Sequence, residues 1–173
     1  MKSKLLILSA FIFVFTMGAK AQKVNRTMED PILHRTVMVG PVTQQGLKTG
    51  IFSTWFNQQY KYYNPETSII NKIKKNINKV NITAVFGSWC GDSKLQVGRF
   101  YKILHDAGYD MSKLKTIAVD RALKAPGLNI SSLQIHRIPT FIIYYKGKEI
   151  GRIVESPKTS LEKDLENILK KVS

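Results

Sequence analysis

The sequence predicts an α/β fold, in which a mixed central sheet is flanked by helices and preceded by an N-terminal helical extension. From residue 80 onward, strand and helix patterns alternate in the order β-α-β-α-β-β-α. A turn at Lys146-Gly147-Lys148 joins the two late strands as a hairpin, so the sheet is mixed rather than all parallel. The chain has 173 residues, 43% of them hydrophobic, which is enough for one domain with a core and an extension.

Residues 1–21 have the features of a secretory signal peptide. Lys2 and Lys4 give a basic start, an apolar segment runs from Leu5 to Met17, and Ala19-Lys20-Ala21 is a small-x-small cleavage signal. The apolar segment is shorter than the roughly 20 residues that span a bilayer, which favours cleavage over retention as an anchor. We therefore expect an exported protein, most simply in a bacterial periplasm, with no stable membrane anchor after cleavage.

The chain is strongly basic, with a formal net charge of +15, or +12 once Lys2, Lys4 and Lys20 are removed. A basic surface can attract nucleic acids or anionic membranes. The lysines are spread along the chain, however, and no zinc-finger, recognition-helix or aromatic–basic RNA signature accompanies them. We therefore expect a solvated basic surface and no nucleic-acid partner.

Residues 22–79 form the predicted N-terminal extension, which has two helices. Before them, residues 33–39 favour a strand that Gly40-Pro41 ends. The first helix places four aromatic side chains and one glutamine on one side, at positions Phe52, Trp55, Phe56, Gln59 and Tyr60. This face is expected to pack against the following domain. The second helix begins at Asn64-Pro65 and turns four isoleucines inward, namely Ile69, Ile70, Ile73 and Ile77.

The predicted domain spans residues 80–173. Strands are expected over residues 80–86, 114–119, 140–145 and 149–154. Helices are expected over residues 92–107, 128–135 and 159–172, the last of them strongly amphipathic.

Cys90 is the only cysteine of the chain, and it lies where the first of these strands meets the following helix. Free backbone N–H groups and the positive end of the helix dipole favour the thiolate there. The negative charge of Asp92 opposes this effect, although a carboxylate is also favoured in the first turn of a helix. Because one cysteine cannot form an internal disulfide, Cys90 is a free thiol, a partner in mixed disulfides, or the link in a Cys90–Cys90 dimer.

The histidines give no indication of a metal site. His34, His105 and His136 lack metal-ligand spacing with one another and with Cys90. Neither a metal ion nor another cofactor is therefore expected.

The order of these features resembles the thioredoxin superfamily, over about residues 80–171. Trp89-Cys90-Gly91 follows an apolar strand, Val119-Asp120 ends the next strand, and Ile138-Pro139-Thr140 opens the late hairpin. The resemblance implies a thioredoxin-like fold, with a cis peptide bond before Pro139, beside the active cysteine. It also implies that the backbone before this proline pairs with extended substrate segments. The substrate-binding residues that it implies are Trp89, Gly91, Asp92, Arg137, Ile138 and Pro139.

The chain departs from the family pattern at two positions. The usual Cys-Gly-Pro-Cys becomes Cys90-Gly91-Asp92-Ser93, so the resolving position holds a hydroxyl. The acid that the family places six residues before the nucleophile is replaced by Ala84. Both changes count against ordinary dithiol–disulfide turnover.

Three interpretations remain open. The first is a monothiol thiol–disulfide oxidoreductase in which Cys90 forms mixed disulfides that an external thiol reductant resolves, while the Ser93 hydroxyl donates to the thiolate. Its partners would be protein or small-molecule thiols and disulfides, in a role in cell redox homeostasis. The second is a redox-inactive thioredoxin-fold module that binds extended peptides or proteins. The third is a structural domain with an inert cysteine. Arg137 either supports the thiolate or points to solvent.

Overall fold

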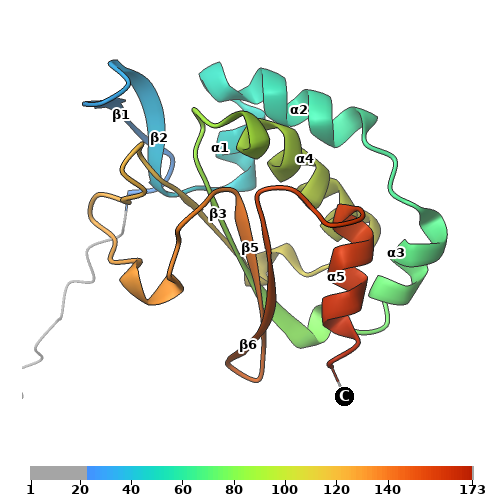
Figure 1. Ribbon diagram of the computed structural model, residues 1–173. Coiled ribbons are helices and arrows are strands. Elements are labelled where there is room, and N and C mark those ends of the chain that lie inside the picture. The colour runs from blue at the N-terminus through green and yellow to red at the C-terminus, as the bar shows by residue number, and fades with distance from the viewer. Residues whose placement is uncertain (1–22, 173) are drawn as a thin grey trace, which may run out of the picture.

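The computed structural model describes residues 23–172, so the predicted signal peptide at residues 1–21 lies outside it. Within the described residues, six strands form one sheet in the order β1-β2-β4-β3-β5-β6 (Figure 1). The strands are β1 (Arg26–Asp30), β2 (Arg35–Pro41), β3 (Val80–Phe86), β4 (Leu114–Ala118), β5 (Thr140–Tyr145) and β6 (Lys148–Val154). The α-helices are α1 (Gln44–Lys48), α2 (Ser53–Tyr62), α3 (Thr67–Ile73), α4 (Gly91–Asp106) and α5 (Leu161–Leu169). None of the described helices has the length and hydropathy needed to cross a membrane.

The predicted mixed sheet is confirmed. β3 pairs in parallel with β4 on one side and antiparallel with β5 on the other, and β5 forms the late hairpin with β6. All of β3 except Asn81 is buried, because the strand is rich in β-branched residues and has neighbours on both sides. The strand ends at Phe86, and the chain then turns into α4.

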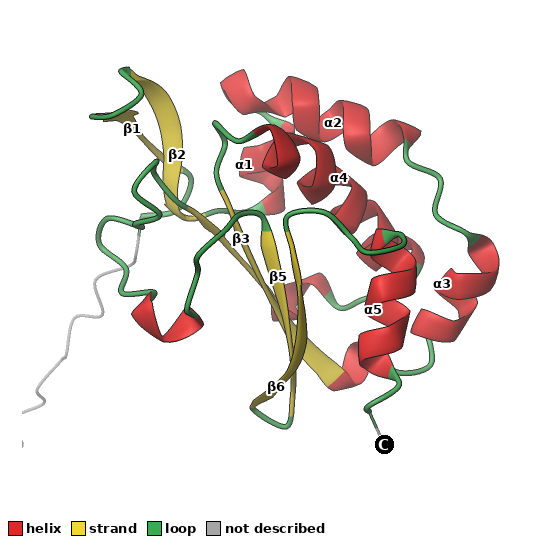
Figure 2. Cartoon of the chain, viewed as in Figure 1, coloured by secondary structure: helices red, strands yellow, loops and turns green. Residues whose placement is uncertain are grey.

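The core divides into two clusters on opposite faces of the sheet, because side chains alternate along each strand. Along β3, Ala84 and Phe86 belong to the larger cluster, whereas Val85 belongs to the smaller one. The larger cluster includes residues from each of the α-helices, and Figure 2 shows α1 to α5 on one side of the sheet. On the other side, the segment between β4 and β5 provides the cover.

The prediction of a helix over residues 128–135 is wrong. The structure has a single 3₁₀ turn at Ser131–Leu133 there, and Gln134 follows it with a left-handed φ of 50°. Asn129 accepts hydrogen bonds from both the N–H and the hydroxyl of Ser131, which is a local turn that competes with a helix. The apolar side chains of this segment pack on the smaller cluster as loop residues, so their spacing did not distinguish a short helix from an anchored loop.

The aromatic side of α2 packs against α4, as predicted. Phe56 is completely buried and meets Tyr101 of α4 edge-on, with the ring centroids 5.2 Å apart. Gly98 of α4 allows this close approach, since a Cβ there would lie 2.7 Å from the carbonyl oxygen of Phe56. The four isoleucines predicted to face inward from the next helix are all buried, although α3 begins at Thr67 rather than at the predicted Pro65.

An N-terminal hairpin extends the sheet at one edge. β1 pairs antiparallel with β2, and the end of β2 pairs with β4 through Gly40 and Pro41. The predicted strand at residues 33–39 overlaps β2, but β1 was not predicted, because most of its side chains are exposed and the strand lacks an apolar pattern. The predicted extension therefore omits β1 and the short helix α1.

The hairpin is tied to the turn after β4 by the buried carboxylate of Asp30. One of its oxygens accepts hydrogen bonds from the N–H groups of Ile32 and Leu33, and the other accepts one from Arg121 at 2.7 Å. Burial raises the pKa of Asp30, but these three hydrogen bonds, helped by the charge of Arg121, lower it more. The pKa of Asp30 therefore lies below its usual range.

We expect the Asp30→Asn variant to unfold more easily than the wild type at pH 7. The side-chain amide of asparagine has only one accepting oxygen in place of the two carboxylate oxygens, so one of the three N–H donors loses its acceptor. Because the folded pKa is lowered, the contribution of Asp30 is present above the ordinary pKa of about 3.9 and is lost as the pH falls below it. The difference in unfolding free energy between the two proteins should therefore shrink below about pH 4 in urea titrations.

The exposed neighbour Glu29 provides the control, since the Glu29→Gln variant should follow the wild-type pH profile. A constant difference between wild type and Asp30→Asn from pH 7 to pH 2 would contradict this account of the hairpin.

Candidate active site

Cys90 is the N-cap residue of α4, with extended backbone angles of φ −85° and ψ 132°. Its side chain is half-buried and makes no capping hydrogen bond to the helix. The thiol instead faces the loop before β5, where its Sγ donates to the carbonyl oxygen of Ile138 at 3.6 Å. The predicted nucleophile and the predicted proline loop therefore lie side by side.

The proline loop is held by its own hydrogen bonds. The Ile138–Pro139 peptide bond is cis, the geometry that the family resemblance implies. The Thr140 hydroxyl donates to the carbonyl oxygen of Arg137 at 2.7 Å, and the N–H of Glu155 donates to the carbonyl oxygen of Pro139 at 2.7 Å. Ile138 and Pro139 are both buried, so this loop forms one fixed wall beside the thiol.

Ser93 does not have the predicted contact with Cys90. Its side chain is fully buried, and its Oγ accepts a hydrogen bond from the N–H of Gly87 at 3.2 Å. No hydrogen bond between Ser93 and Cys90 is present in the part of the chain that the structure describes. The hydroxyl instead joins the first turn of α4 to the end of β3.

Gly87 allows the two walls of the site to close on each other. A Cβ at this position would lie 2.6 Å from Cδ1 of Ile138 and 2.8 Å from the indole ring of Trp89. Only a residue without a side chain fits between them. From the sequence, Gly87 had no role beyond its position after the predicted strand over residues 80–86, and so this close approach was missed.

Trp89 is held from three directions. Its indole Nε1 donates to the carbonyl oxygen of Val119 at 3.0 Å. The guanidinium of Arg121 lies over its ring, 5.0 Å from the centroid, and Nη2 of Arg35 donates to its carbonyl oxygen at 3.2 Å.

A hydrogen bond from the N–H of Met38 to the Ser88 hydroxyl, at 2.9 Å, attaches β2 to the same turn. These contacts from the hairpin were missed because the sequence did not predict that β2 joins the sheet beside β4.

The remaining predicted residues lie at the outer side of the turn. Gly91 and Asp92 are exposed in the first turn of α4. Arg137 is 69% exposed and pairs with Glu155, whose Oε2 lies 2.9 Å from its Nη1. Arg137 therefore points to solvent and to Glu155 rather than to the thiol.

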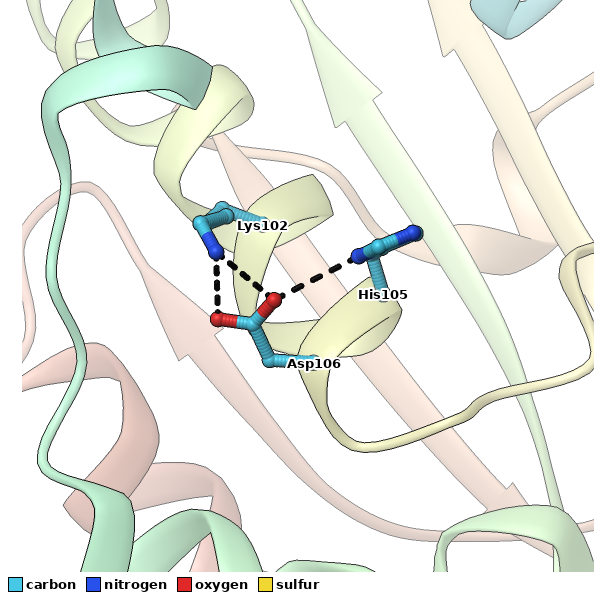
Figure 3. Close-up of polar contacts among 3 residues, drawn as sticks. All are labelled: Lys102, His105 and Asp106. Atoms are coloured by element: carbon cyan, nitrogen blue, oxygen red, sulfur yellow. Dashed lines mark hydrogen bonds and ion pairs between the residues drawn. The ribbon is translucent and has the colours of Figure 1, made fainter.

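The charged cluster at the other end of α4 is not part of this site. Figure 3 shows Lys102 and His105 around Asp106, with distances of 2.7 Å and 3.3 Å to its carboxylate. α4 has 16 residues, so this cluster is separated from Cys90 by roughly 20 Å of helix. Among residues 23–172, no three or more His, Cys, Asp and Glu side chains are grouped so that they could hold a metal ion.

We expect the Gly87→Ala variant to lose about 1–3 kcal/mol of unfolding free energy, because the added methyl group forces Ile138 and Trp89 apart. The matched control is Gly91→Ala, since nothing lies within 4 Å of a Cβ built at Gly91. Urea denaturation of the three proteins measures the difference. Equal stability of the two variants would show that the walls can separate without cost.

Comparison with known proteins relates the chain to thioredoxins. No protein-family model matches it. Over 109 residues it is 28% identical to mitochondrial thioredoxin O of Oryza sativa subsp. japonica, which covers 61% of this chain and 58% of that protein. The chain thus spans under two thirds of the length of this curated relative.

Two solved thioredoxin structures are also similar. Mitochondrial thioredoxin 3 of Saccharomyces cerevisiae, in its oxidized form, has a TM-score of 0.38 and 21% identity, covering 63% of this chain and 98% of that one. The thioredoxin of Trypanosoma brucei brucei has a TM-score of 0.37 and 23% identity, covering 61% and 87%. The similarity in sequence, together with the mixed sheet and the position of Cys90, supports the thioredoxin-like superfamily for this chain.

Proposed function

We propose that this chain is an exported thioredoxin-like protein that uses one reactive thiol, Cys90, in thiol–disulfide exchange. The observation that carries the proposal is the position of this thiol. Its Sγ is half-buried at the start of α4 and lies 3.6 Å from the carbonyl oxygen of Ile138, just before the cis peptide bond. A thiol at a helix N-terminus with access to solvent is placed for nucleophilic attack on a disulfide.

The exchange has two steps. The Cys90 thiolate attacks one sulfur of a substrate disulfide, the substrate S–S bond breaks, and the second substrate sulfur leaves as a thiolate. A mixed disulfide on Cys90 remains. Because position 93 is a serine, an external thiolate attacks this mixed disulfide, forms a new disulfide with the substrate sulfur, and releases Cys90 as a thiolate. Protein or small-molecule thiols supply that second step.

The proline loop offers a place for an extended substrate segment. Within residues 23–172, the N–H of Ile138 has no hydrogen-bond partner, and its carbonyl oxygen is contacted by the thiol alone. An extended peptide can pair with such main-chain groups as an added strand does. This feature also suits the alternative function, a redox-inactive module that binds extended peptides. Only experiments that depend on a reaction of the Cys90 sulfur can therefore distinguish thiol–disulfide exchange from peptide binding.

We expect the Ser93→Cys variant to gain insulin-disulfide reductase activity that the natural sequence lacks. A second thiol at this position can attack the mixed disulfide from within the chain and release the substrate. Turbidity of reduced insulin measures the gain, and the Ser93→Ala variant, which has no second sulfur, serves as the control. A folded Ser93→Cys protein without activity would favour the binding module.

Trapping of partners separates the two functions directly. We expect mixed-disulfide species on nonreducing gels of periplasmic extracts with the natural protein, and their complete loss with Cys90→Ala. The control is Ser112→Ala, an exposed hydroxyl far along the chain from the turn. Partners retained equally by Cys90→Ala would contradict the redox function.

A further inference from the structure

Two guanidinium groups contact Trp89, the residue next to the reactive thiol. Nη2 of Arg35 donates to the main-chain oxygen of Trp89 at 3.2 Å, so this charge lies one peptide unit from Cys90. The guanidinium of Arg121 lies 5.0 Å from the centroid of the indole ring. We call Arg35 and Arg121 the arginine pair.

The hairpin fixes the arginine pair relative to the thiol. Arg35 begins β2, and the next part of this strand is bonded to the turn through the N–H of Met38 and the hydroxyl of Ser88. Arg121 follows β4, and its N–H donates to the buried carboxylate of Asp30 at the end of β1. Two segments far apart in the sequence thus each place a guanidinium against the same residue, Trp89.

The arginine pair has no carboxylate partner of its own at ion-pair distance. Among the described residues, Arg137 pairs with Glu155 and Arg152 pairs with Glu149, but no carboxylate oxygen lies within 4.0 Å of either guanidinium of the pair. Asp30 interacts with the charge of Arg121 only at longer range, and three N–H groups already occupy its oxygens. Both arginines are exposed and therefore accessible to a ligand.

We propose that the arginine pair selects disulfides that carry a carboxylate close to the sulfur attacked by Cys90. This inference rests on the proposed function. A guanidinium binds carboxylates through paired, charge-assisted hydrogen bonds, which suits it to this choice. In the exchange step the Cys90–S bond forms as the substrate S–S bond breaks, and the electron pair leaves on the second sulfur, so no additional oxidant is required.

The test compares two aromatic disulfides that differ in charge. 5,5′-Dithiobis(2-nitrobenzoate) carries two carboxylates, whereas 4,4′-dithiodipyridine is uncharged, and the leaving group of each is followed by its own absorbance. We expect the double variant Arg35→Gln/Arg121→Gln to react about tenfold more slowly with the anionic disulfide, as expected when a steering field is removed. Removal of the two charges can also change the thiol itself, and the rate with the uncharged disulfide measures that effect, so the ratio of the anionic to the uncharged rate should fall about tenfold.

The control removes the same net charge from the other end of the sheet. Lys79 and Lys148 are exposed, and they lie near Val80, at the opposite end of β3 from Cys90. We expect Lys79→Gln/Lys148→Gln to keep the wild-type rates with both disulfides. Arg35→Lys, which retains the charge, should keep most of the preference for the anionic disulfide, and added salt should reduce that preference.

Two outcomes would overturn the selection of anionic disulfides, and a third would overturn the proposed thiol function as well. Equal slowing by the arginine and lysine double variants would show an effect of net charge alone, and would overturn the selection. Equal slowing of both disulfides in the arginine variant would show that the pair only holds the turn, which also overturns it. If folded wild-type protein fails to react even with the uncharged disulfide, the proposed thiol function is wrong, and the selection is lost with it.

Discussion

The close approach of Trp89 and Ile138 over the bare Cα of Gly87 is the contact on which the rest of the site depends. It brings the end of β3 against the proline loop, so the half-buried thiol of Cys90 lies beside the main-chain carbonyl of Ile138. It also presses the indole against the end of β4, where Val119 accepts its N–H. Strand ends from three parts of the chain thereby meet around one sulfur.

The unequal cover of the two sheet faces explains why the N-terminal hairpin matters. The helices bury one face in a large apolar cluster, whereas the other face has a smaller cluster beneath an irregular segment. Trp89 and Cys90 pack against this smaller cluster. The hairpin reaches the same region through the hydrogen bonds of Asp30 with Arg121 and of Met38 with Ser88.

The elements that the sequence predicted well are those whose side chains are buried in a regular pattern. The strands Val80–Phe86 and Thr140–Tyr145 have the predicted bounds, because a short, mostly apolar and β-branched or aromatic run between turn residues admits few alternatives. β1 escaped prediction because its pairing depends on the partner strand and on one buried carboxylate, not on its own apolar residues. In the site, the position of Cys90 and its place beside the proline loop followed from the motif. The hydrogen-bond partner of Ser93 did not, since a buried hydroxyl can accept from any of several nearby donors.

The hydrogen bond between Gly87 and Ser93 has an evolutionary consequence. The buried N–H at the end of β3 needs an acceptor, and a serine oxygen is a much better one than a sulfur. A lineage that exchanged a cysteine for serine here would gain a stronger link between strand and helix, and the reverse exchange would give that link up.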